Sequence, residues 1–317
     1  MESSKAYDIY FEDYQRARSL NKLIYSKIIG GLGNQMFQYA AARAVSLKLD
    51  TPLLLDTRNY SSYKLHQGFE LPFVFNIAAE LACEHDLEKF LSWEKYKLFR
   101  KLLSYVGLKS QKTSKFMPEP YFQYWSEIEN VEIGCYLSGY WQSEKYFSSF
   151  KTQIRRDFEF RQPVSDLNAA ISDEILSVNA VSVHIRRGDY ITNPRTNSVH
   201  GVCSINYYDQ AISFMVQKLT NPKFFIFSDD PLWVKNNLKT DYTCKFIAHN
   251  HGVESYNDMR LMSLCKHHII ANSSFSWWGA WLNPEPEKLI VAPQNWFSDP
   301  NIDTNDLIPK DWKRMEN

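Results

Sequence analysis

Apolar positions follow two spacings along this chain. Short runs of β-branched and aromatic residues, such as residues 181–185 and 223–227, indicate buried strands. Longer stretches, such as residues 207–219, carry apolar side chains three and four positions apart, which indicates helices. Strands and helices that alternate in this way are typical of βαβ units, so the pattern predicts an α/β fold with doubly wound parallel sheets.

The second half of the chain has the more regular alternation. Further strands are predicted at residues 245–248, 268–271 and 289–292. Further helices are predicted over residues 165–176, 231–238, 256–265 and, after a short loop, 273–282. Ser165 suits the N-cap position of the first of these helices, and Pro231 suits the first turn of the second.

The first half is harder to interpret. Strands are predicted at residues 25–29, 52–56 and 135–141, and helices over residues 34–49 and 144–157. Residues 65–75 have the pattern of a loop, and residues 78–107 that of a polar, aromatic helix before a break at 118–120. The predicted organisation is an N-terminal extension (1–22), a first α/β half (23–160) and a second half (161–317).

Composition excludes several classes of function. Lysine and arginine together number 36, as do aspartate and glutamate, so the formal net charge of zero argues against a nucleic-acid partner or a polybasic membrane surface. The five cysteines are scattered and odd in number, which favours reduced thiols over a disulfide framework or a zinc site. Aromatic residues make up 15% of the chain, which fits either an aromatic core or sugar binding.

The segment SVHIRRGDYI, residues 182–191, carries the strongest chemical signal. It places Arg186 and Arg187 at the end of a predicted buried strand, where α/β sheets bind ligands. Two buried guanidinium groups need anionic partners, and Asp189 can satisfy only part of that demand. A phosphate suits the planar arginine fork. The alternative is a structural arginine–aspartate network.

Two other strand-to-helix junctions could also approach an anion. Residues 30–34, GGLGN, differ from the dinucleotide-binding G-x-G-x-x-G pattern, yet their glycines let a ligand approach helix N–H groups. Residues 272–276, NSSFS, place three hydroxyls at a second helix start. Each junction has a purely structural alternative, a tight turn in the first and a serine N-cap in the second.

Three segments together resemble one enzyme family. HIRRGD at residues 184–189 resembles the H-x-R-R-x-D motif of α1,2-, α1,6- and protein-O-fucosyltransferases. GGLGNQMFQYA at 30–40 and IANSSFSWWGAWL at 270–282 resemble the two signatures of the α1,2-fucosyltransferase family, glycosyltransferase family 11, in its bacterial form. The resemblance implies a GT-B-like fold, in which two Rossmann-like halves face each other across a cleft. Residues 23–160 would form the acceptor side and residues 161–317 the nucleotide-sugar side.

The resemblance also implies an activity. The chain would be an inverting galactoside α1,2-fucosyltransferase that moves L-fucose from GDP-β-L-fucose to the 2-hydroxyl of a terminal galactose in a glycan, with no cofactor and no metal. The adjacent pair Asp229-Asp230 is not the metal-binding D-x-D pattern. Alternatives are another GDP-sugar transferase of this fold with a different linkage, and a non-catalytic protein that binds glycans or nucleotides.

Site residues follow from the same resemblance. Arg186 would contact the β-phosphate, Asp258 would accept the guanine N–H groups, and Asn34 would lie near the donor phosphate or the fucose. The remaining donor-site candidates are His184, Arg187, Asp229, Ser273, Ser274, Gly31 and Gly33. For Arg187 a structural role is favoured, paired to Asp189 or to the acidic loop 228–230.

The general base is not evident from the sequence. The catalytic candidates are Arg186, Asn34 and Asp189, and Asp189 is the only acid in the strongest motif. The α1,6 relatives have a glutamate a few residues beyond the motif, whereas residues 192–195 here contain no acid.

Localisation is predicted from missing segments. The N-terminus has no apolar signal-peptide core, and no apolar run is as long as a membrane span. Since animal members of the family carry a Golgi anchor, this favours a cytoplasmic bacterial-type enzyme or a truncated chain. Peripheral association with the inner membrane, through a glycolipid acceptor, stays open. No nucleic-acid partner is expected.

Overall fold

The computed structural model describes residues 22–62, 67–87, 115–188, 199 and 201–317. The chain divides into two compact units, which are described separately. Unit 1 comprises Met1–Pro72 and Asn76–Glu159, and unit 2 comprises Phe73–Phe75 and Phe160–Asn317.

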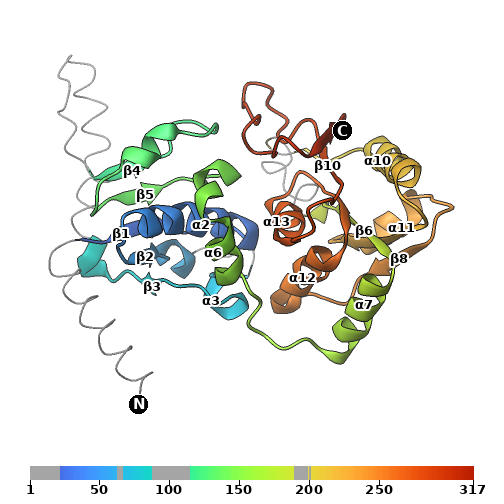
Figure 1. The fold of residues 1–317 in the computed structure, drawn as a ribbon, viewed down its shortest axis with the longest axis horizontal. Helices are drawn as coiled ribbons and strands as arrows, with labels where there is room; N and C mark the ends of the chain where they lie inside the picture. Colours follow the sequence, from blue (N-terminus) through green and yellow to red (C-terminus); the bar gives the residue numbers. More distant parts are fainter. Residues whose placement is uncertain (1–21, 63–66, 88–114, 189–198, 200) are drawn as a thin grey trace. The chain divides into compact units, whose positions relative to one another are not determined.

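Unit 1 is built on a parallel sheet whose described strands have the order β3-β2-β1-β5-β4 (Figure 1). Their bounds are β1 Ile24–Lys27, β2 Leu53–Asp56, β3 Glu80–Leu81, β4 Phe116–Pro118 and β5 Tyr136–Ser138. The central strands are almost wholly buried, which fits their apolar sequences. Because every pair is parallel, the loops after β1, β2, β4 and β5 leave from one edge of this sheet.

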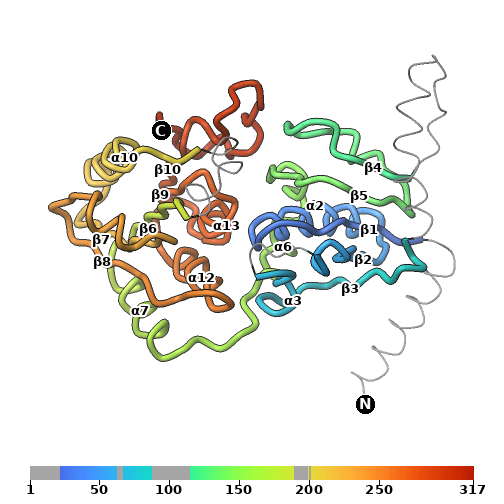
Figure 2. Tube along the Cα trace, turned by 180° about the vertical axis from the view of Figure 1, so that it is seen from behind, coloured from blue at the N-terminus to red at the C-terminus, as the bar shows by residue number. Residues whose placement is uncertain are grey.

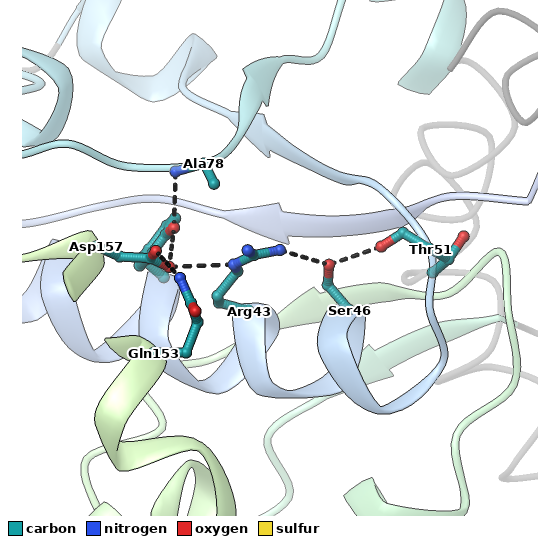
Figure 3. A network of polar contacts seen from close by, with 7 residues as sticks. Arg43, Ser46, Thr51, Ala78, Gln153 and Asp157 are labelled. Atoms are coloured by element: carbon teal, nitrogen blue, oxygen red, sulfur yellow. Dashed lines mark hydrogen bonds and ion pairs between the residues drawn. The ribbon is translucent and has the colours of Figure 1, made fainter. Parts of the chain in front are cut away.

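Helix α2 (Leu32–Lys48) packs against β1 and β2 and against α6 (Lys151–Asp157). A buried polar network joins these elements (Figure 3). Asp157 on α6 accepts hydrogen bonds from the Tyr39 hydroxyl at 2.7 Å and from Arg43 Nε at 3.1 Å, both on α2. The Ala78 N–H donates to the Tyr39 oxygen at 2.9 Å, so the segment before β3 is tied to the same helix.

The shorter elements of unit 1 lie in its connections. Helix α3 spans Leu71–Val74, where the chain passes into unit 2. The 3₁₀ turns are η1 Arg58–Ser61, η2 Ser126–Asn130, η3 Glu144–Tyr146 and η4 Ser148–Phe150.

Unit 2 is built on a second parallel sheet, whose described strands have the order β11-β10-β9-β6-β7-β8 (Figure 2). Their bounds are β6 Asn179–Ile185, β7 Pro222–Ser228, β8 Cys244–Ile247, β9 His267–Ile269, β10 Ile290–Pro293 and β11 Lys313–Met315. The chain runs outward from β6 to β8, returns to β9 beside β6, and then runs outward the other way. The strand order therefore reverses between β6 and β9, which is where open α/β sheets bind ligands.

Helices cover both faces of this sheet. α10 (Ile205–Lys218) and α11 (Pro231–Asn237) pack on one face, around buried residues such as Tyr207 and Met215. α7 (Asp166–Ser177), α12 (Tyr256–Leu264) and α13 (Ser274–Leu282) lie on the other (Figure 1). One further 3₁₀ turn, η5, spans Gly252–Glu254. Trp277, Trp278 and Trp281 of α13 are buried.

The structure corrects several sequence-based boundaries. Residues 65–75 are not all loop, because Leu71–Val74 is helical. Within 78–107, Glu80–Leu81 is an edge strand instead of helix, and 88–107 lie outside the described residues. The predicted helix 144–157 is two 3₁₀ turns followed by α6, since the Ser143 side chain caps a separate turn at the Lys145 N–H. Most of the extension 1–22 also lies outside the described residues.

Among the helices in the described part of the chain, none combines the length and the apolar character that a membrane span requires.

Candidate functional site

The first part of the site forms at the strand-order reversal of unit 2. β6 pairs in register with β7 on one side and with β9 on the other, and all three strands are parallel. Their carboxyl ends therefore lie along one edge of the sheet. The residues that follow these ends are Arg186 after β6, Asp229 after β7, and Ser273 and Ser274 after β9.

Arg186 is held by the loop after β7. Its Nη1 lies 2.9 Å from Asp229 Oδ2, and its side chain is only 25% exposed. The other carboxylate oxygen of Asp229 accepts the Arg187 N–H at 2.8 Å. A Cβ atom at Gly188 would lie 2.6 Å from Asp229 Oδ2, so only glycine fits this close approach. The Asp229 carboxylate thus orients the Arg186 guanidinium.

Arg187 contacts a different set of residues from Arg186. Its guanidinium carbon lies 3.4 Å from the centre of the Trp233 ring on α11, and its Nε lies 3.6 Å from Asp230 Oδ2. Of the two pairings expected for Arg187, the one with the acidic loop is therefore present. The other partner, Asp189, lies outside the described residues.

His184 is buried at the end of β6, beside Arg186. The pKa of His184 is lowered to about 4, mainly by burial, with Asp229 opposing this effect and the Arg186 charge adding to it. The imidazole is therefore neutral at pH 7. Its ring lies 5.9 Å from that of Phe275 in the first turn of α13, which places the start of α13 next to the end of β6.

The serine loop after β9 acts as a helix cap. Ser273 is the N-cap of α13, and its hydroxyl accepts the Phe275 N–H at 3.4 Å. Ser274 is the first residue of the helix. The serine N-cap that was the structural alternative for this segment is therefore present. Ser274 is half-buried at the helix N-terminus, a position that favours anions.

Asp258 lies in the first turn of α12, which starts from the same edge of the sheet. Asn250 Nδ2 donates to Asp258 Oδ1 at 2.8 Å, and Asn250 Oδ1 accepts from Asn168 Nδ2 at 3.0 Å. Asn168 Oδ1 in turn lies 2.8 Å from His249 Nε2. Burial raises the pKa of Asp258 to about 7, against the opposing effect of the Asn250 hydrogen bond. The carboxylate is held in place and lacks a cation among the described residues.

The glycine loop belongs to unit 1. Gly30 has a φ of +83°, and its carbonyl accepts from Gln35 Nε2 at 3.0 Å and from the Tyr60 hydroxyl at 2.7 Å. Gly31 is the N-cap of α2 and supplies no capping side chain, while Gly33 lies in the first turn. Asn34 Oδ1 accepts from Gln142 Nε2 at 2.7 Å, which links the loop to the end of β5. Asn34 therefore belongs to unit 1, and the other described donor-site candidates apart from Gly31 and Gly33 belong to unit 2.

Comparison with known proteins identifies the family. A family model described as Glycosyl transferase family 11 matches residues 98–316. An α-1,2-colitosyltransferase from Escherichia coli is 37% identical over 305 residues, which cover 93% of this chain and 99% of that protein. This chain belongs to glycosyltransferase family 11. The O-antigen biosynthesis glycosyltransferase WbnK, also from Escherichia coli, is 34% identical over 88% of this chain and 96% of its own.

The fold of this family 11 glycosyltransferase agrees with a solved structure. A mutant of Arabidopsis thaliana FUT1 in complex with GDP aligns with a TM-score of 0.52 at 13% sequence identity, covering 88% of this chain and 72% of that chain. The prediction of a GT-B-like α/β fold with two parallel-sheet halves is therefore confirmed.

Sequence reasoning overlooked three polar residues of the family 11 chain. Gln142 donates to Asn34, and Glu119 and Glu70 are carboxylates whose pKa burial raises to about 7. Glu119 stands between two prolines at the end of an edge strand, and Glu70 directly precedes α3. A search for acids directly after each strand would have found Glu119, had β4 itself been predicted.

Within the described residues there is no group of three or more histidine, cysteine, aspartate or glutamate side chains that could hold a metal ion. Of the described acids, Asp229 pairs with Arg186 and Asp230 pairs with Arg187. Metal independence stays a prediction.

Proposed function

We propose that this family 11 glycosyltransferase is an inverting α1,2-fucosyltransferase, with GDP-β-L-fucose as donor and a galactose-terminated glycan as acceptor. The observation that carries the proposal is the edge of the unit 2 sheet. Arg186 and the Ser273–Ser274 start of α13 flank the strand-order reversal there. A guanidinium and a helix N-terminus together suit a diphosphate.

In the proposed reaction the galactose 2-oxygen bonds to fucose C1 as the bond from C1 to the phosphate oxygen breaks. The electron pair of that bond leaves with GDP, and attack on the opposite face turns the β linkage into an α linkage. Arg186 neutralises charge that develops on the leaving phosphate, where a pre-oriented cation acts most strongly. The hydroxyl proton passes to a base or to water.

We propose that Asp258 recognises the guanine ring of the donor. Its carboxylate is fixed by Asn250 and has no counter-charge among the described residues, so two N–H groups of guanine would supply the missing hydrogen bonds. Adenine presents a lone pair where guanine presents N1–H, and so it would be rejected.

A second donor is favoured by one observation, the 37% identity to a protein named as an α-1,2-colitosyltransferase. Colitose is fucose without its 3-hydroxyl. Transfer from either donor would follow the same inverting chemistry, because the two sugars differ only in the 3-hydroxyl group.

The deciding experiment offers the purified chain GDP-fucose or GDP-colitose together with methyl β-D-galactoside. We expect a fucosylated product whose anomeric proton coupling shows an α linkage to O2. Faster transfer of colitose would reassign the donor, and another linkage would reassign the acceptor position. GDP binding in a thermal-shift assay without any turnover would indicate the non-catalytic alternative.

A further inference from the structure

Glu119 occupies the edge of the unit 1 sheet at the end of β4. Its N–H donates to the Ser138 carbonyl at 2.9 Å, which continues the pairing of β4 with β5. Its carboxylate accepts the N–H groups of Tyr140 at 2.7 Å and of Trp141 at 3.0 Å. Prolines on both sides restrict the backbone, so the carboxylate is fixed in direction.

The carboxylate keeps unused hydrogen-bonding capacity. After the two backbone hydrogen bonds each oxygen still has a lone pair to offer. No cation pairs with Glu119 in the described part of unit 1. Neutral hydroxyl groups are suitable partners for such a group, because they satisfy the oxygens without bringing a second charge into a half-buried position.

Two exposed aromatic residues accompany Glu119, namely Tyr121 two positions beyond it in the sequence and Tyr140, whose N–H its carboxylate accepts. Tyr140 is 41% exposed and Tyr121 is 51% exposed, so both rings are accessible from solvent. Besides burial, the Glu119 charge raises the pKa of Tyr140 and of Tyr146. Exposed rings beside a fixed hydroxyl acceptor match the two sides of a pyranose, an apolar C–H face and a rim of hydroxyl groups.

The residue behind these rings is strained and incompletely satisfied. Trp141 has a φ of +54° and is fully buried, and its Nε1 has no hydrogen-bond partner among the described residues. A Cβ atom at Gly139 would lie 2.7 Å from Glu119 Oε2 and 3.0 Å from Trp141 Cε2. The Glu119 carboxylate and the Trp141 ring therefore both lie close to Gly139, where any side chain would collide with them. Strain of this kind is typical of functional sites.

We propose that Glu119, with the rings of Tyr140 and Tyr121, forms the subsite for the terminal galactose of the acceptor. The inference rests on the proposed function for the identity of the sugar. β5 lies between β4 and β1, and Gln142 just beyond Trp141 donates to Asn34, so this subsite adjoins the glycine loop within unit 1. Glu70 is the weaker candidate, because residues 63–66 beside it lie outside the described part of the chain.

The first test measures sugar binding without any transfer. Methyl β-D-galactoside is titrated into the full chain by NMR, in wild type, Glu119→Gln and Tyr140→Ala. Removal of a charged acceptor should weaken galactoside binding by about 10- to 100-fold. Glu132→Gln is the matched control, because this exposed glutamate precedes β5 at the opposite edge of the sheet. GDP affinity should be the same in all four proteins.

Gly139→Ala is an independent test that keeps the charge. The new Cβ atom would lie 2.3 Å from Glu119 Cβ and so must push the carboxylate aside. It should raise the acceptor KM as Glu119→Gln does, with the donor KM unchanged. Circular dichroism and GDP affinity establish that each variant is folded.

A pH profile distinguishes a direct contact from a structural one. Since burial raises the pKa of Glu119 to about 7, the acceptor KM should rise as the pH falls below 7. Tyr140 and Tyr146, which face Glu119, titrate well above this range. Glu119→Gln should abolish the dependence.

The outcomes separate the two proposals. If Glu119→Gln keeps the galactoside affinity and the acceptor KM of wild type, the proposed galactose subsite is wrong, whichever sugar the enzyme transfers. Galactoside binding that depends on Glu119, in a protein that transfers neither sugar, would retain the subsite and reject the proposed function.

Discussion

At the scale of single residues, the site is governed by which charges already have partners. Arg186 pairs with Asp229 but stays 25% exposed, whereas Arg187 lies against Trp233 and Asp230. Two adjacent arginines with the same chemistry thus have different environments, and the phosphate contact is proposed for Arg186.

Replacement of Arg186 by alanine should lower kcat by about 100- to 1000-fold, the usual effect of removing one pre-oriented donor from a developing charge. Arg186→Lys should restore the ion pair with Asp229 but little activity, because an ammonium lacks the planar fork. Steady-state kinetics at saturating acceptor would test this. Arg156→Ala, at an exposed position on α6, is the control. Turnover of Arg186→Ala close to that of wild type would remove Arg186 from the mechanism.

Asp258 allows a prediction about both stability and specificity. Burial raises its pKa from 3.8 to about 7, so the folded state holds the proton more tightly than the unfolded state does. The free energy of unfolding should therefore fall as the pH rises from about 4 to about 7, by at most about 1.4 kcal/mol per unit of separation between the two pKa values. Asp258→Asn should remove this dependence and raise the Tm of the ligand-free protein at pH 8.

The same variant should lose guanine recognition. A site built for hydrogen bonding rejects an unsuitable analogue by roughly 10⁴-fold in favourable cases, so wild type should prefer GDP strongly over ADP. Calorimetric titration of both nucleotides into wild type and Asp258→Asn would measure the change. If the variant binds GDP as wild type does, the guanine pocket lies elsewhere and Asp258 only complements the helix dipole.

At the scale of elements, burial decides what the sequence could predict. β6 and β7 have neighbours on both sides, so they are long apolar runs and their positions were predicted. Three of the four edge strands, β3, β4 and β11, are only two or three residues long, and none of them was predicted. The fourth edge strand, β8, is four residues long and was predicted. Glu119 was missed for the same reason, since its position depends on the pairing of β4 with β5.

Backbone conformation at the start of α2 gives a prediction with a matched control. Gly30 and Gly68 have φ angles of +83° and +81°, but a Cβ atom at Gly30 would lie 2.9 Å from Asn34 Nδ2, whereas one at Gly68 meets nothing within 4 Å. Alanine should cost each position about 1–2 kcal/mol of stability. Only Gly30→Ala should also reduce kcat, because it displaces Asn34. Urea unfolding and kinetics of both variants would test this, and equal activity would argue against a role for Asn34.

At the scale of the whole molecule, the two-unit α/β organisation was accessible because each half repeats strands and helices around its own sheet. The motifs at residues 30–40, 184–189 and 270–282 come from both units. They indicated in advance which strand ends carry the candidate site residues. The hydrogen bonds from Asn168 through Asn250 to Asp258 join α7 to the segment between β8 and α12, which is far from α7 in sequence. Such contacts arise from packing and have no local pattern to reveal them.

The balance of charge at the proposed diphosphate site leads to a prediction for the complete enzyme. A transferase that leaves charge neutralisation to a metal needs free carboxylates beside the phosphates, but Asp229 and Asp230 are both committed to arginines. Arg186 and the N-terminus of α13 would instead stabilise the departing GDP.

Transfer from GDP-fucose should therefore continue at an unchanged rate in excess EDTA and gain little from Mg²⁺ or Mn²⁺. It should slow at high salt, which screens the guanidinium from the phosphate. A matched assay of Arg186→Lys should remain slow under all these conditions. A strict requirement for either metal would mean that Asp229 leaves Arg186 to bind it, and the role of Arg186 would then have to be reassigned.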